Sequence, residues 1–165
     1  MSTPGEIVLP RRAQVLVVKL SSLGDLFHAI PVVHELVRQL EAQVDWVTQP
    51  ENAELVRCFA DVRRVISFPR RGTWRSRLAY ARDVRGTRYD AVLDLQGLLK
   101  SALAARVARS PLRIGPSWQR EGARLFYHRI AGKLDKQRHA IEEASDFIRL
   151  LGLAVSPPAF PLNFP

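Results

Sequence analysis

The stretch Val15–His28, VLVVKLSSLGDLFH, indicates the fold of this chain. Its first six residues, Val15–Leu20, are mostly apolar and β-branched, which is typical of a strand buried on both faces, as in a parallel sheet. A short polar turn over residues 21–25 follows, and the apolar residues after it recur at helical spacing. A strand, a tight turn and a helix form the half-unit from which α/β proteins build binding sites. Asp25 lies in this turn, where an acidic residue can act either as a catalyst or as a helix cap.

The composition is that of one globular domain with an excess of basic residues. The chain has 165 residues, 47% of them hydrophobic, which is enough for a core. The single Cys58 cannot form an intramolecular disulfide, which is typical of a reducing compartment. Lys and Arg number 25 against 16 Asp and Glu, a net charge of +9. This charge favours an anionic partner (nucleic acid, a membrane surface or a phosphorylated substrate), and a solvated basic surface is the alternative.

Alternating strand and helix patterns predict an α/β fold with a doubly wound, Rossmann-like parallel sheet. Strands are expected at 15–20, 44–48, 64–68, 90–95 and 113–115, and helices at 51–59, after 73, and at 98–108, 120–130 and 138–151. The helix after the first strand should have a short first turn, a kink, and a main part starting near Pro31.

The predicted strand order places a ligand site at one edge of the sheet. If the second and third strands lie on one side of the first and the fourth on the other, the order reverses between the first and fourth strands. The turns 21–25 and 96–97 then line one crevice, which is where such sheets bind ligands.

The ends of the chain differ in composition from its middle. Residues 1–14 lack the apolar core of a signal peptide and are predicted to be a loose leader of a cytoplasmic protein. Residues 15–153 form the predicted domain. Residues 154–165 are rich in proline and read as a linker, so we expect a further domain beyond it.

Asp25 has two interpretations from its local pattern alone. Ser22-Leu23-Gly24-Asp25 matches a capping box, in which Ser is followed three residues later by an acid, and the helix dipole favours an acid in the first turn. In the predicted crevice, an exposed carboxylate can instead accept a proton from a substrate hydroxyl. The pattern alone favours the cap.

Other residues near the predicted crevice are ambiguous. His28 follows Asp25 by three residues and can face the crevice, but His28 and His34 are six apart and lack the spacing of metal ligands on one helix face. Lys19 and Lys100 can reach an anion or extend to the surface. The arginines at 70–77 suit bidentate phosphate binding, with a solvated basic face as the alternative.

Two motifs carry a resemblance to a known family. The segments VKLSSLGDLFHAIPVVHEL (18–36) and DAVLDLQGLLKSALAAR (90–106) are similar to those of the lipopolysaccharide heptosyltransferases of glycosyltransferase family 9, particularly the heptosyltransferase I type. The segments VDWVTQ and RRVISFPRR between them also resemble this family, and the likeness covers 15–153.

The resemblance implies a fold and a reaction. The family has two Rossmann-like domains of the GT-B type, and this chain corresponds to the N-terminal, acceptor-binding half. The reaction moves heptose from ADP-L-glycero-D-manno-heptose to Kdo of the inner core, inverting the anomeric centre without an obligatory metal or cofactor. Asp25 corresponds to the general base. Without the donor-binding domain, the chain is expected to be inactive.

The resemblance also implies roles for further residues. Arg70, Arg71, Arg75 and Arg120 would hold the carboxylates and phosphates of a Kdo–lipid A acceptor. The remaining acceptor-binding positions would be Lys19, Ser22, Gly24, Gln96, Gly97 and Lys100. The expected location is cytoplasmic, peripheral on the anionic inner face of the bacterial inner membrane.

Two other functions remain open from the sequence. One is a non-catalytic module that binds acidic glycolipid. The other is a nucleic-acid-binding domain, which is not expected because only Trp74 and Tyr80 accompany the arginines.

Overall fold

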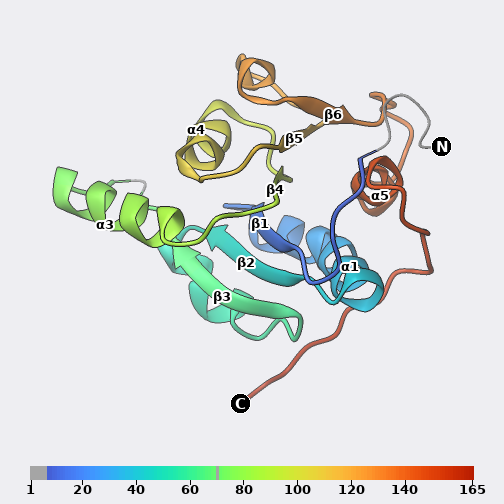
Figure 1. The fold of residues 1–165 in the computed structure, drawn as a ribbon, viewed down its shortest axis with the longest axis horizontal. Coiled ribbons are helices and arrows are strands. Elements are labelled where there is room, and N and C mark those ends of the chain that lie inside the picture. Colours follow the sequence, from blue (N-terminus) through green and yellow to red (C-terminus); the bar gives the residue numbers. More distant parts are fainter. Residues whose placement is uncertain (1–6, 70) are drawn as a thin grey trace.

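A computed structural model describes residues 7–69 and 71–165. The chain forms a parallel sheet with strand order β3-β2-β1-β4-β5-β6 (Figure 1). The strands span β1 Gln14–Val18, β2 Gln43–Thr48, β3 Val62–Ser67, β4 Ala91–Asp94, β5 Arg113–Pro116 and β6 Arg129–Ala131. Each strand pairs in parallel with its neighbours in this order. The doubly wound sheet and its reversal between β1 and β4 are therefore confirmed.

Helices cover both faces of the sheet (Figure 1). On one face lie α1 Leu23–Leu40, α5 Ala140–Leu150 and the short pair η1 Pro50–Asn52 and α2 Ala53–Val56. On the other lie α3 Trp74–Arg85, α4 Leu99–Val107 and η2 Ala123–Phe126. A βαβ crossover is right-handed, so the connections that run from β3 across to β4, β5 and β6 place α3, α4 and η2 on the face opposite α1 and α2. α5 follows the last strand and packs back beside α1.

The core consists of two apolar layers separated by the sheet. Alternate residues of β1 point to opposite faces, so Val15 and Val17 pack toward α1 and α5, whereas Leu16 and Val18 pack toward α3 and α4. All four are fully buried. This two-sided burial explains why the strand is a continuous apolar run in the sequence.

The prediction for the first helix was wrong about its start. α1 is continuous from Leu23 to Leu40, with Pro31 inside it. Proline removes one backbone donor from a helix interior, at a cost of about 3 kcal/mol. Pro31 and its neighbours Ile30, Val32 and Val33 are buried against the core, and this packing offsets the lost hydrogen bond.

The predicted helix at 120–130 was also wrong. This segment forms the short helix η2 and leads into a sixth strand, β6, which pairs with β5. Leu125 is 88% exposed, so its apolar side chain does not mark a buried helical face.

Residues 7–13 and the segment after α5 both contact the domain. Leu9 and Ala13, which precede β1, are buried in the core. Near the other end, the Ala60 N–H donates to the Pro161 carbonyl at 3.1 Å, and the Asn163 N–H donates to the Cys58 carbonyl at 2.7 Å. Within residues 7–69 and 71–165, every helix is too short or too polar to cross a membrane.

Candidate functional site

A pocket of about 280 Å³ opens at the carboxyl ends of β1 and β4. It lies where the strand order reverses, as expected for an open α/β sheet. Its lining comes from the turn after each of these strands, α1, the segment after β5, and α5. The lining residues are Lys19, Asp25, His28, Ala29, Leu95, Gln96, Leu98, Trp118, Arg120, Ala140, Glu143 and Ala144.

Asp25 lies in the first turn of α1, and its two carboxylate oxygens differ in environment. Oδ2 accepts from the Ser22 N–H at 3.3 Å and from the Ser22 hydroxyl at 2.7 Å. Oδ1 lies 3.7 Å from His28 Nδ1. The Ser22 hydroxyl and N–H, with the charge of Lys19, lower the pKa of Asp25 against a smaller opposing effect of burial. The carboxylate is therefore ionised at neutral pH.

The cap and the proton acceptor use different atoms of the same carboxylate. Oδ2 satisfies the Ser22 N–H at the start of α1, which is the acidic half of a capping box. The side chain remains 51% exposed and lines the pocket. Oδ1 can therefore accept a proton from a bound hydroxyl while Oδ2 keeps its contacts with Ser22.

Lys19 directly follows β1 and lines the same pocket as Asp25. Its Nζ donates to the Leu95 carbonyl at 3.0 Å, and the residue is only 9% exposed. Burial lowers the pKa of Lys19, although the charges of Asp25 and Asp94 oppose this effect. The ammonium links the end of β1 to the turn after β4.

Gln96 forms a second link between the same two turns. Its side-chain oxygen accepts from the Leu20 N–H at 3.2 Å and the Ser21 N–H at 3.3 Å. These donors follow β1, whereas Gln96 follows β4. Gln96 therefore fixes the backbone that leads into Ser22 and Asp25.

The turn that contains Gln96 is held by the buried carboxylate of Asp94. Asp94 Oδ1 accepts from the N–H groups of Gln96 and Gly97 at 2.9 and 3.1 Å. Oδ2 accepts from the hydroxyls of Ser101 and Tyr127 at 2.9 and 2.5 Å. Burial raises the pKa of Asp94, while these four donors act in the opposite direction.

A glycine on β5 allows Tyr127 to reach Asp94. A Cβ placed on Gly115 would lie 2.1 Å from the Tyr127 ring. The ring therefore occupies the space that a side chain at position 115 would need. Tyr127 follows η2, so the Asp94 cluster connects β4 and α4 with a segment far along the chain.

Gly97 brings Arg120 to the pocket. Gly97 has a φ of +77°, and a Cβ there would lie 2.7 Å from Pro116 Cγ. The left-handed conformation and this close approach both favour glycine. The Gly97 carbonyl accepts from the Arg120 N–H at 2.8 Å, which positions Arg120 beside the turn.

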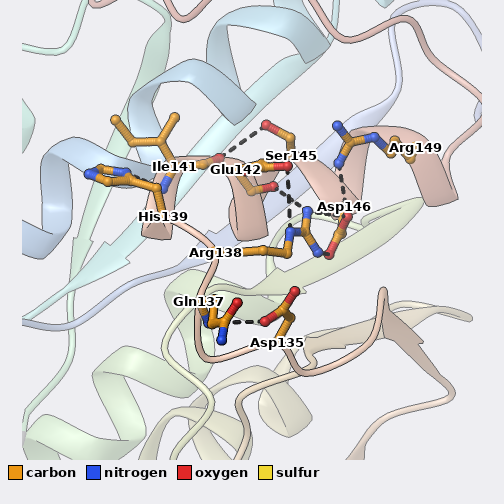
Figure 2. A network of polar contacts seen from close by, with 9 residues as sticks. All are labelled: Asp135, Gln137, Arg138, His139, Ile141, Glu142, Ser145, Asp146 and Arg149. Atoms are coloured by element: carbon orange, nitrogen blue, oxygen red, sulfur yellow. Dashed lines mark hydrogen bonds and ion pairs between the residues drawn. The ribbon is translucent and has the colours of Figure 1, made fainter.

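The remaining wall of the pocket is the start of α5. Figure 2 shows the polar contacts that hold this end of the helix. Arg138 Nη1 and Nη2 donate to the two carboxylate oxygens of Asp146 at 2.8 and 3.0 Å, and Nη2 also donates to the Glu142 carbonyl at 3.0 Å. Arg149 Nη1 donates to Asp146 at 2.9 Å. These contacts fix the backbone that leads into His139, whose ring lies edge-on to that of His28 with centroids 6.1 Å apart.

Glu143 is a second carboxylate in this pocket. Burial raises the pKa of Glu143, and the charge of Arg138 partly opposes the effect. The pocket therefore contains one carboxylate with a lowered pKa, Asp25, and one with a raised pKa, Glu143. Opposite shifts of this kind are typical of functional sites.

The structure separates the predicted site residues into groups. Lys19, Asp25, Gln96 and Arg120 line the pocket, Ser22 contacts Asp25, and Gly97 contacts Arg120. Gly24 and Lys100 do not line it. Arg71 lines a separate hollow of about 510 Å³ with Pro69 and Ser76, and the Arg75 guanidinium lies 5.5 Å from the centre of the Trp74 ring. Arg70 lies outside the described residues.

Among the polar and aromatic side chains that line the pocket, sequence reasoning missed Trp118 and Glu143. Trp118 follows β5, and Glu143 belongs to α5. The amphipathic pattern of α5 predicted the helix but not which of its polar residues face the pocket. His28 was left open in the sequence, and the structure places it beside Asp25.

Comparisons with known proteins match the chain to one family. The family model "Glycosyltransferase family 9 (heptosyltransferase)" matches residues 77–157. Lipopolysaccharide heptosyltransferase 1 of Escherichia coli K12 is 36% identical over 155 residues, covering 84% of this chain and 48% of the relative. The enzyme of the same name from Pseudomonas aeruginosa is 33% identical over 144 residues, covering 78% and 40%.

Solved structures agree with these matches. The E. coli heptosyltransferase WaaC with ADP has a TM-score of 0.76 at 36% identity, covering 89% of this chain and 50% of that chain. The same enzyme with ADP-2-deoxy-2-fluoro heptose has a TM-score of 0.74 at 30% identity, covering 89% and 51%. The chain thus spans about half the length of these relatives. It belongs to glycosyltransferase family 9, the heptosyltransferase family.

Proposed function

We propose that this chain is the N-terminal, acceptor-binding half of an inverting heptosyltransferase. The reaction transfers heptose from ADP-L-glycero-D-manno-heptose to a Kdo hydroxyl of the lipopolysaccharide inner core. The names of the relatives support the lipopolysaccharide substrate, and the relatives solved with ADP and with an ADP-heptose analogue support a nucleotide-sugar donor.

The observation that carries the proposal is the Asp25 carboxylate in the pocket at the strand reversal. Oδ1 accepts the proton of the acceptor hydroxyl, and the hydroxyl oxygen forms a bond to the anomeric carbon of heptose. The bond from that carbon to the ADP oxygen breaks, and ADP leaves with the electron pair. Attack opposite the leaving group inverts the anomeric centre. The lowered pKa keeps Asp25 ionised, and an ordered Ser22 contact keeps it in place.

Positive side chains around Asp25 suit an acidic sugar acceptor. Lys19 and Arg120 line the same pocket, and Arg71 lines the separate hollow just before α3. Guanidinium groups bind carboxylates and phosphates bidentately, so Arg120 and Arg71 are proposed to hold the acidic groups of a Kdo–lipid A acceptor. Such an acceptor implies work at an anionic membrane surface, which the net charge of +9 favours.

Substitution of Asp25 by Asn tests the base separately from the cap. An Asn side-chain oxygen can still accept from the Ser22 N–H, but it cannot act as a general base. Asp25→Asn should lower kcat by about 10²–10⁴-fold, with acceptor affinity and thermal stability retained. Turnover is measured with ADP-heptose and Kdo–lipid A, using protein expressed from the complete natural reading frame.

Two further variants complete the design. Asp25→Ala should lose turnover to the same extent and also about 1 kcal/mol of stability, because it removes the cap. Asp83→Asn on α3, an exposed acid remote from the pocket, is the matched control and should retain turnover. Normal turnover of Asp25→Asn would refute the base assignment. Retained acceptor binding in a protein without any turnover would favour the glycolipid-binding module.

A further inference from the structure

Charge is divided unequally between the two helical layers. The helices α3, α4 and η2 contain seven Lys and Arg and one acid, Asp83, a net charge of +6. The helices α1 and α5 contain two Arg and five acids, a net charge of −3. The basic residues of the first layer are Arg75, Arg77, Arg82, Arg85, Lys100, Arg106 and Arg124. Among the helices, the positive charge is therefore concentrated on one face of the sheet.

The same layer exposes large apolar side chains. Trp74 and Leu78 on α3 are 69% and 42% exposed, and Leu99 and Leu103 on α4 are 39% and 46% exposed. Each pair is separated by four residues, so its members lie on one side of their helix. Among the described residues of α1 and α5, Leu23 is the only large apolar side chain of this kind. Apolar and basic groups thus share the outer surface of α3 and α4.

α3 is anchored at one end and exposed at the other. Tyr80 and Val84 are its buried residues, and the Tyr80 hydroxyl donates to the Ala104 carbonyl of α4 at 2.9 Å. The other end, which begins at Trp74, reaches away from the sheet (Figure 1). This end follows β3, so it lies toward the same edge of the parallel sheet as the Asp25 turn.

The arginines of α3 lack acidic partners. Across residues 7–69 and 71–165, Arg75, Arg77 and Arg82 form no ion pair. Unpaired guanidinium groups are available to phosphate oxygens. A face with a charge of +6 repels a second copy of itself, and exposed leucines add nothing to the binding of a polyanion such as nucleic acid. Basic residues mixed with Trp and Leu are instead typical of helices that lie on a membrane surface.

We infer that the outer surface of α3 and α4, here called the α3–α4 face, binds bilayers that contain anionic phospholipid. Trp74 and Leu78 enter the boundary between headgroups and acyl chains, and Arg77 and Arg82 contact lipid phosphates. The inference rests on the proposed function for its account of the lipid-linked acceptor. A protein that lies on the bilayer with this face would hold the edge of its pocket near the membrane, where such an acceptor is anchored. Binding itself requires neither sugar nucleotide nor acceptor.

Vesicle sedimentation of the 165-residue chain tests the inference. The vesicles contain phosphatidylcholine with about one-third phosphatidylglycerol, or phosphatidylcholine alone. Binding to the anionic vesicles is expected, with at least about tenfold weaker binding to the neutral ones. Arg77→Glu with Arg82→Glu, and Trp74→Ser with Leu78→Ser, should each weaken binding to anionic vesicles by about tenfold or more. Circular dichroism checks that each variant is folded.

Matched controls separate this face from bulk charge and bulk hydrophobicity. Lys133→Glu with Lys136→Glu changes the net charge by the same amount as the Arg77/Arg82 variant, but in the exposed connection between β6 and α5. Val155→Ser with Phe160→Ser removes apolar groups that are 42% and 43% exposed near the C-terminus. Both controls should stay within about twofold of the parent.

Three outcomes would overturn the inference. The first is failure of the folded parent to bind anionic vesicles. The second is an equal loss in the Lys133/Lys136 control, which would assign binding to net charge. The third is unchanged binding of the Trp74/Leu78 variant together with equally tight binding of DNA, which would indicate a general polyanion surface. None of these results depends on heptose transfer, so the proposed function is tested separately by Asp25→Asn.

Discussion

The Tyr127 hydroxyl donates to Oδ2 of Asp94 at 2.5 Å, across 33 residues of sequence. Asp94 is fully buried, and its other donors are the N–H groups of Gln96 and Gly97 and the Ser101 hydroxyl. The turn held by Asp94 supplies Gln96, whose side chain binds the backbone just before the Asp25 turn. Tyr127 is thus a positioning residue two contacts away from the pocket.

Tyr127→Phe should destabilise the domain and alter the β1 turn. Removing one donor from a buried carboxylate costs about 1–3 kcal/mol. The Leu20 and Ser21 amides, which donate to Gln96, should exchange with solvent faster in the variant. Urea unfolding measures the first effect, and amide hydrogen exchange measures the second.

Tyr80→Phe is the matched control for that substitution. Its hydroxyl also donates within the α3–α4 side of the core, to the Ala104 carbonyl, but lies outside the Asp94 cluster. It should lose stability without a selective change at Leu20 and Ser21. Equal exchange changes in both variants would show that the effect is global rather than transmitted through Asp94.

Gly24→Ala should separate ligand contact from folding. A Cβ at Gly24 would meet no atom within 4 Å, and the residue lies in the first turn of α1. Alanine should therefore keep or raise stability, by up to about 1 kcal/mol. If the acceptor approaches this backbone, as the family resemblance implies, the acceptor KM should rise while kcat is kept. An unchanged KM in a stable variant would remove Gly24 from the acceptor site.

Acid stability should depend on the buried Asp45. Burial tends to raise the pKa of Asp45, but hydrogen bonds from Arg63 and Tyr89 and the charge of Arg64 outweigh it, so its pKa is lowered. The burial of Tyr89 and its bond to Asp45 raise the pKa of Tyr89 to about 12, so its phenol remains a donor. A carboxylate with a lowered folded pKa adds stability above its unfolded pKa, near 4, and this contribution is lost as the pH falls through the folded value.

Asp45→Asn should therefore be less stable at pH 7 by about 1–3 kcal/mol, because it weakens the hydrogen bonds at a buried acceptor. The loss is smaller than for a fully buried ion pair because the guanidinium partners, Arg63 and Arg64, are 39% and 41% exposed and stay in contact with water. Its stability should also fall less steeply than that of the parent below about pH 5. Urea unfolding across this pH range measures both quantities. Asp83→Asn, whose acid is exposed, should leave the parent's slope unchanged; an identical slope in Asp45→Asn would contradict the assignment.

The main fold could be predicted because its signals are local. Each buried strand is a short apolar run, and the order of strands and helices implies a parallel sheet with a reversal beside β1. β6 was missed because it spans only Arg129–Ala131 and pairs with one neighbouring strand, so it has little apolar pattern. Pro31 misled the helix prediction because burial of its surroundings is a tertiary effect.

The site was predictable only where topology determines it. Asp25 and Gln96 both follow strands adjacent to the reversal, so parallel pairing alone brings them to one edge. Glu143 and Trp118 reach the pocket through the packing of α5 and the path of the chain after β5, which no spacing encodes. The role of Asp94 also requires Tyr127, and their meeting depends on the missing side chain of Gly115.

The Gln96 and Lys19 bridges have a mechanical consequence for the pocket. Gln96 binds Leu20 and Ser21, and Lys19 binds Leu95, so the turns after β1 and β4 are cross-linked in both directions. They form one stiff floor without an independent hinge. A change in pocket width on ligand binding is then expected at the α5 wall and in the segment that carries Trp118 and Arg120, whereas the alignment of Asp25 with the floor stays constant.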